Sequence, residues 1–180
     1  MILPASSPSR VRLLATTALL VGSGGVAMAQ DSSQLERGEF LATAGNCASC
    51  HTADGGEPYA GGLPVDTPFG VLYSPNITPH ETGIGDYTRE QFFASTRQGI
   101  NADGEPMYPA HPYPFYTKMT DEDVEALWAY MQTIEPVENE VEVVQLDFPF
   151  NVRAGLTAWQ AVAFEEGRFE PHADQSEQWN

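Results

Sequence analysis

Basic side chains are scarce in this sequence. Its 180 residues hold only 8 Lys and Arg against 25 Asp and Glu, which gives a net charge of −17. Lys118 is the single lysine. A chain this acidic lacks the positive surface that binds phosphate backbones or anionic membrane faces. The composition therefore argues against nucleic acid as a partner and against docking on a membrane surface.

Long apolar runs are also missing, and the one short run lies near the N-terminus. Residues 1–12 contain Arg10 and Arg12 and no acid, an apolar stretch covers residues 13–21, and Ala27-Met28-Ala29 follows. A basic start, a short apolar middle and an A-x-A site are the parts of a secretory signal, and the run is short for a membrane span. We expect residues 1–29 to be a signal peptide, and the remaining chain to be periplasmic with no membrane span.

Cysteine is limited to two residues, which form the segment Cys47-Ala48-Ser49-Cys50-His51. A zinc site would need two further ligands at metal-site spacing, and the sequence offers none. A thioredoxin-like redox pair would follow a strand in a βαβ unit, whereas Gly45-Asn46 precedes this motif. C-x-x-C-H is instead the attachment pattern of c-type haem. Two thiols one helical turn apart reach the two vinyl groups, and His51 then lies below the iron as a ligand. The motif predicts one covalent haem c.

The rest of the chain alternates helical periodicity with loops rich in Gly and Pro. Helices are expected over residues 34–45, 88–98 and from Thr120 towards Pro136, because each begins with a capping pattern. A further helix is expected from Val152 to about Ala163, and residues 52–82 are predicted to be loop. No segment alternates convincingly as a strand, although residues 141–144 could be extended. The pattern therefore predicts an all-α fold.

Several further segments give the chain a family resemblance. With its haem motif ahead of a Pro-rich loop and a helical C-terminal part, the chain resembles a class I c-type cytochrome. More closely, it resembles the haem domains in cytochrome subunits of membrane-associated alcohol, aldehyde and gluconate dehydrogenases. The segments that carry this resemblance are Arg37-Gly38-Glu39-Phe40-Leu41, Ala60-Gly61-Gly62-Leu63-Pro64, Thr67-Pro68-Phe69-Gly70, Ser74-Pro75-Asn76-Ile77-Thr78-Pro79 and Thr82-Gly83-Ile84-Gly85-Asp86-Tyr87-Thr88.

The resemblance implies a fold and a division of the chain. It implies the class I cytochrome c fold over residues 30–137, followed by a partly helical C-terminal extension over residues 138–180. Those subunits usually carry three haem domains, so this chain is either a free-standing one-haem relative or a first domain. By the same resemblance, the first and last helices would cross at a small residue, so that Gly38 and Phe40 or Leu41 would meet Leu127 and Tyr130. A backbone carbonyl, assigned to Pro64, would hold the proximal imidazole, and Tyr87 and Arg97 would either bind the propionates or pack structurally.

The sixth iron ligand is the point where this sequence departs from its relatives. The family motif reads tyrosine-proline-alanine-methionine-proline-tyrosine, with the methionine on iron, and this chain has Tyr108-Pro109-Ala110-His111-Pro112-Tyr113. Imidazole is a competent iron ligand. His111 is therefore the first candidate, and Met107 and Met119 are the alternatives. An open or water-bound iron is the remaining possibility.

Two functions follow from these expectations. The first is a single-electron carrier that links an exported dehydrogenase to a quinone or a terminal oxidase of the respiratory chain, and is not itself an enzyme. The sequence offers no nucleophile–base pair or paired carboxylates, which favours this interpretation. The second is a haem-based gas sensor or a peroxidase-like enzyme, which needs an open or displaceable sixth position.

Overall fold

The computed structural model describes residues 32–180, so the predicted signal peptide lies outside the described residues. Helices form over α1 (Ser32–Ala44), α2 (Cys47–Cys50), α3 (Arg89–Gln98), α4 (Tyr113–Tyr116), α5 (Asp121–Met131) and α6 (Ala154–Ala163). Strands form over β1 (Pro64–Thr67), β2 (Gly70–Tyr73) and β3 (Val144–Leu146). Within these residues, no helix has the combination of length and hydrophobicity that crossing a bilayer requires.

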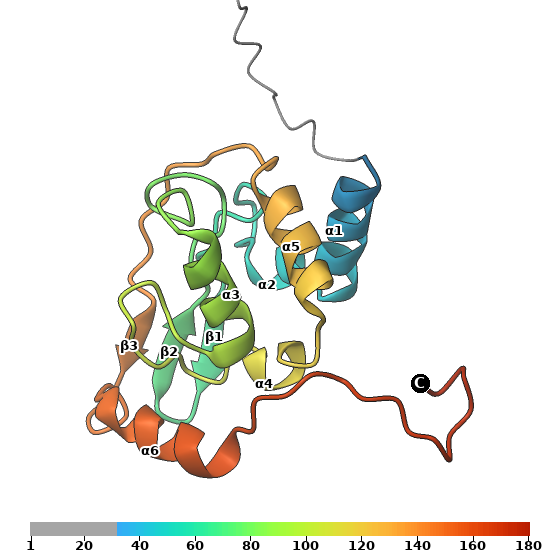
Figure 1. The fold of residues 1–180 in the computed structure, drawn as a ribbon. Helices are drawn as coiled ribbons and strands as arrows, with labels where there is room; N and C mark the ends of the chain where they lie inside the picture. The colour runs from blue at the N-terminus through green and yellow to red at the C-terminus, as the bar shows by residue number, and fades with distance from the viewer. Residues whose placement is uncertain (1–31) are drawn as a thin grey trace, which may run out of the picture.

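The first and fifth helices cross at a glycine. Figure 1 shows α1 packed against α5, and α2 and α3 contact this pair at α1 and α5 respectively. A Cβ added at Gly38 would lie 2.1 Å from the carbonyl oxygen of Ala126 and 2.6 Å from the Cβ of Tyr130. The predicted crossing is confirmed at Tyr130, and the backbone of Ala126 is its second partner. The core below this crossing consists of Ala42, Ile84, Phe92, Val124, Leu127 and Met131.

The capping patterns fix the starts of two helices. At α3, the Gln91 backbone N–H donates to the Thr88 hydroxyl oxygen, and the Thr88 backbone N–H donates to the Gln91 side chain. At α5, the Asp123 backbone N–H donates to the Thr120 hydroxyl oxygen. Both caps are confirmed, and Gly99 ends α3 in the left-handed region with φ 67°. Helix α1 is described from Ser32, two residues before the start expected at residue 34.

A small antiparallel sheet corrects the prediction of an all-α fold. The predicted loop over residues 52–82 contains β1 and β2, which pair from Pro64 opposite Tyr73 to Thr67 opposite Gly70. The third strand comes from the C-terminal extension and places Gly70 opposite Leu146. Each strand has only three or four residues, which is too short for an alternation of apolar and polar residues to be recognised in the sequence. The helices expected around the C-x-x-C-H motif are retained, with this sheet added.

The C-terminal extension stays against the rest of the molecule from β3 to about residue 169. Figure 1 shows α6 beside the sheet and the following segment running past α4. The predicted helix from Val152 begins slightly later, at Ala154. The extension ends in a segment beyond residue 169 whose side chains are largely exposed, including Trp179 at 56% exposure.

Candidate functional site

The two cysteines are presented by a single helical turn. Asn46 adopts a left-handed conformation (φ 58°) that reverses the chain after α1, and α2 then carries Cys47 and Cys50. The His51 backbone N–H closes the turn on the Cys47 carbonyl at 2.9 Å. Both thiols are free; Cys47 is half-buried and Cys50 is exposed. Burial raises the pKa of the Cys47 thiol. Residues three apart on a helix share one face, so the turn directs both sulfurs the same way.

The imidazole of His51 is fixed by a backbone carbonyl. Its Nδ1 lies 2.8 Å from the carbonyl oxygen of Pro75. A carbonyl oxygen only accepts hydrogen bonds, so Nδ1 carries the proton and Nε2 keeps its lone pair for a metal. Burial lowers the pKa of His51, which favours this neutral form. The assignment of the carbonyl to Pro64 is wrong, because Pro64 is the first residue of β1 and pairs there with Tyr73.

His111 is the second imidazole of the site and lacks a partner on one nitrogen. Among the described residues, its Nε2 is the one buried side-chain nitrogen or oxygen without a hydrogen bond. Burial lowers the pKa of His111 to about 4, and the charge of His51 acts in the same direction, while a hydrogen bond to the Ser95 backbone opposes them. The His111 ring meets Tyr116, which lines the cavity beside Cys47. An unpartnered buried nitrogen costs free energy unless something binds it. An iron bound at this Nε2 would satisfy it.

An apolar cavity of about 230 Å³ lies next to Cys47. Its walls come from α1, α4 and α5 and from the turn between α1 and α2. They consist of Leu41, Ala44, Gly45, Cys47, Tyr116, Met119 and Leu127. Tyr116 closes one side, where its hydroxyl donates to the Gly45 carbonyl at 2.6 Å, and its ring meets the edge of His111 with centroids 5.6 Å apart. These residues fit the apolar surround of a porphyrin attached through Cys47, while Cys50, His51 and His111 are not among the cavity-lining residues.

The two alternative methionines occupy different places. Met119 lines the apolar cavity and packs against the hydrophobic core. Met107 donates its backbone N–H to the Gly99 carbonyl and is not among the cavity-lining residues. Met119 therefore lines the same cavity as Cys47, and His111 meets Tyr116 on that cavity, whereas Met107 lies on the loop before them.

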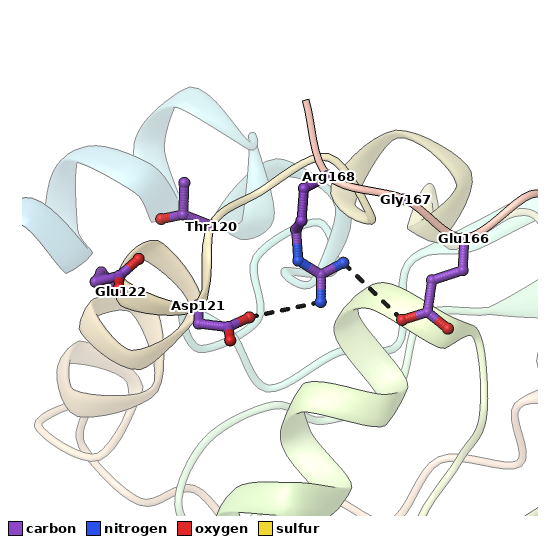
Figure 2. Close-up of a pocket in the computed structure, with 6 residues that line it drawn as sticks. All are labelled: Thr120, Asp121, Glu122, Glu166, Gly167 and Arg168. Carbon is purple, nitrogen blue, oxygen red and sulfur yellow. Dashed lines mark hydrogen bonds and ion pairs between the residues drawn. The ribbon is translucent and has the colours of Figure 1, made fainter. Parts of the chain in front are cut away.

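A larger and more open hollow of about 690 Å³ lies elsewhere, over the start of α5. Figure 2 shows Arg168 between Asp121 and Glu166 at this hollow. Asp121 also pairs with Arg97, whose Nη1 is 2.5 Å from the carboxylate and whose side chain is only 8% exposed. Arg97 is therefore held by Asp121 and by the Met119 carbonyl. None of Cys47, Cys50, His51 or His111 lines this hollow. The ion pair from Arg168 to Asp121 joins the extension to the start of α5.

Replacing Asp121 by asparagine is expected to reduce stability in a pH-dependent way. Arg97 holds the pKa of Asp121 below its usual range, with Arg168 adding to the effect. A depressed folded-state pKa stabilises the protein above the unfolded pKa and loses that contribution as pH falls. Asp121→Asn should therefore lower the melting temperature by a few degrees at most at pH 7, and the difference should disappear in acid. Thermal melts across pH 3–7 measure it, with Glu122→Gln as the matched control; a deficit that does not vary with pH would contradict the ion pair.

The comparisons with known proteins agree with this geometry. A nicotinate dehydrogenase subunit of Pseudomonas putida is 44% identical over 174 residues, which cover 96% of this chain and 14% of that protein. The fructose dehydrogenase cytochrome subunit of Gluconobacter japonicus is 48% identical over 137 residues, or 74% of this chain and 28% of that protein. A dihaem cytochrome c-type protein of Cereibacter sphaeroides is 35% identical over 138 residues, or 73% of this chain and 47% of that protein.

The chain thus spans less than half the length of each of these relatives. The match to a family model depends on this chain alone and not on the length of these relatives. The cytochrome c family model covers residues 35–135, more than half of the chain, and its span includes both cysteines and both imidazoles described above. Together with the thiol pair on one helical turn and the fixed proximal imidazole, this match shows that the chain belongs to the cytochrome c family.

Proposed function

We propose that this protein is a single-electron carrier with one haem c, bound through Cys47 and Cys50 and ligated by His51 and His111. The observation that carries the proposal is the buried Nε2 of His111, which has no hydrogen-bond partner among the described residues and belongs to a ring that meets Tyr116 on the cavity beside Cys47. When bound, haem supplies an iron that alternates between two oxidation states one electron apart. Two imidazoles held by the backbone would ligate the iron in both oxidation states, which suits electron transfer.

The residues around the site each have a defined task in this proposal. The Pro75 carbonyl accepts a hydrogen bond from Nδ1–H of His51, which orients the ring and raises its basicity toward the metal. The apolar walls at Leu41, Met119 and Leu127 exclude water from one side. Cys50 is exposed, so the edge that it anchors reaches the surface, where a partner can approach.

The partners in this proposal are redox proteins. Several relatives are named as cytochrome subunits of dehydrogenases for fructose, gluconate and alcohol. By analogy, electrons would come from an exported dehydrogenase and leave toward a quinone or a terminal oxidase of the respiratory chain. The net charge of −17 suits a partner with a basic docking face, because complementary charge accelerates encounter. The signal-like residues 1–29 support a periplasmic location.

Changing the two cysteines to serine is expected to abolish covalent haem. Cys47→Ser with Cys50→Ser should give periplasmic protein from which acidified acetone removes all pigment. Either single change should leave one thioether and shift the pyridine haemochrome band. The control is Ser49→Ala, which changes the same turn and removes only the hydrogen bond to Asn46. Mass spectrometry reports the haem number, the linkage and removal of residues 1–29 together. Covalent haem in the double variant would overturn the assignment.

Carbon monoxide separates the carrier from a sensor or a peroxidase-like enzyme. A ferrous haem whose sixth position is filled by His111 reacts only when that imidazole detaches. We expect the reduced protein to bind carbon monoxide slowly and His111→Ala to bind it rapidly. Rapid binding by the unaltered protein would favour the open-site function and would contradict His111 as a ligand.

A further inference from the structure

The loop that carries His111 is covered on its outer side by the C-terminal extension. We call residues 99–119 the ligand loop and residues 150–169 the strap. At the start of the ligand loop, Arg153 donates to the Pro106 carbonyl at 2.9 Å and pairs with Glu105 at 3.3 Å. The Tyr108 hydroxyl in turn donates to the Phe150 carbonyl at 2.8 Å. The strap therefore binds the loop just before His111.

The centre of the strap meets Tyr113, two residues after His111. The side-chain amide of Gln160 on α6 donates to the Tyr113 hydroxyl at 3.2 Å and to the Gly99 carbonyl at 3.0 Å. Phe164 places its ring edge-on to the Tyr113 ring, with centroids 5.0 Å apart and an interplanar angle of 85°. Tyr113 is fully buried by these contacts. Its ring also fills the space beside Gly99, where a Cβ would lie 2.6 Å from the ring.

The end of the strap binds the end of the ligand loop. The Gly167 backbone N–H donates to the Thr117 hydroxyl at 3.2 Å. Arg168 donates to the Thr117 carbonyl at 2.9 Å, and the Phe169 backbone N–H donates to the Lys118 carbonyl at 3.1 Å. Thr117 is fully buried. The ligand loop is thus held along its whole length by a segment outside the stretch that the family model matches.

His111 is tied directly to two of the residues that the strap holds. The Tyr113 backbone N–H donates to the His111 carbonyl at 2.9 Å, and the His111 backbone N–H donates to the Tyr108 carbonyl at 3.2 Å. The strap contacts Tyr108 through Phe150 and Tyr113 through Gln160 and Phe164. A loop freed from these contacts gains conformations in which the imidazole is off the metal, and the bound fraction falls accordingly.

We propose that Gln160 is a positioning residue for the sixth ligand: acting through Tyr113 and Gly99, it holds the ligand loop so that His111 stays on the iron. The inference rests on the proposed function, in which His111 is that ligand. Gln160 suits this task because its two amide hydrogens connect the end of α3, at Gly99, with the centre of the ligand loop, at Tyr113. The C-terminal extension is then a working part of the haem site.

The test measures how fast carbon monoxide binds the reduced holoprotein. Gln160→Ala should increase the binding rate about tenfold, because the fraction of protein with His111 detached rises; a factor of ten corresponds to about 1.4 kcal/mol. Phe164→Leu, which keeps apolar volume but removes the ring contact, should change the rate in the same direction. Val162→Ala is the matched control, since Val162 lies on the same helix and is 90% exposed. It should bind at the wild-type rate.

A second background separates positioning from loosening of the whole protein. In His111→Ala, binding is already rapid, and adding Gln160→Ala should leave the rate unchanged. An equal acceleration in both backgrounds would show that Gln160 acts on general access and would overturn the inference. Slow binding by wild type with no difference between Gln160→Ala and Val162→Ala would also overturn it, while leaving the proposed function intact. Rapid binding by wild type would instead refute the proposed function.

Discussion

Gly38→Ala is expected to destabilise the holoprotein by about 3 kcal/mol, the upper part of the range for overpacking a tight contact. The added Cβ would lie 2.1 Å from the Ala126 carbonyl oxygen, and that oxygen belongs to helical backbone that cannot rotate away. The crossing of α1 and α5 would have to widen. Because α1 leads directly into Cys47, the widening would also shift the motif relative to Leu127 on the cavity wall. Guanidinium-induced unfolding, followed by far-ultraviolet circular dichroism, measures the loss.

Gly155→Ala is the matched control, because it makes the same change in another helix. Nothing lies within 4 Å of a Cβ at Gly155, and the residue is in the first turn of α6. Alanine there should be neutral or stabilise by up to about 1 kcal/mol, through the entropy of the unfolded chain. The two variants are therefore expected to differ in sign. A Gly38→Ala variant as stable as wild type would show that the helices do not cross at this residue.

Local signals in the sequence were sufficient for the helices that begin with side-chain caps. Thr88 with Gln91, and Thr120 with Asp123, satisfy backbone N–H groups within three residues, so no distant partner is needed. Helix α4 carries no such signal: Pro112 precedes it, and four residues are too few to show a period. It forms because its ends are held by tertiary contacts, such as the hydrogen bond from Tyr116 to Gly45.

The sheet depends on pairing between segments that are distant in sequence. Gly70 follows the two-residue loop Pro68-Phe69, has φ 118° and lies opposite Leu146 of the extension. A Cβ at Gly70 would come within 2.5 Å of the Gln145 carbonyl. The Thr67-Pro68-Phe69-Gly70 segment was thus a hairpin signal, but its third strand lies more than seventy residues further along the chain. The carbonyl that accepts from His51 was assigned to Pro64 because its position also depends on distant pairing. The chain that follows β2 places the Pro75 carbonyl beside His51 instead.

The sequence predicted the C-x-x-C-H side of the site more directly than the side that carries His111. Cys47, Cys50 and His51 are contiguous, so spacing alone indicates their shared purpose. His111 could be proposed only through the family resemblance, because the residues around it give no metal-ligand pattern. Its buried, unpartnered Nε2 is a property of the folded chain. The helical period of the sequence predicted α6, but nothing in the sequence indicated that Gln160 and Phe164 would contact the ligand loop.

His111→Met is expected to raise the haem midpoint potential by at least on the order of 0.1 V, a fraction of the ~0.8 V range that axial ligands span. A thioether donates less to the oxidised iron than an imidazole does, so the reduced state gains relative stability. The variant also restores the methionine of the family motif between Ala110 and Pro112. Spectroelectrochemical titration measures the potential, and the weak near-infrared band from methionine to ferric iron should appear only in the variant.

Met119→Leu and Met107→Leu are the controls that make this result specific to position 111. Met119 lines the apolar cavity, and leucine keeps its volume without a sulfur. Neither change should move the potential as far as His111→Met does, because neither removes a donor to the metal. If wild type shows the methionine band and Met119→Leu abolishes it, the sixth ligand is Met119. His111 would then be a buried imidazole beside the iron, and its unpartnered Nε2 would need an ordered water instead. A histidine ligand requires the opposite pattern, in which the band is absent until methionine replaces His111.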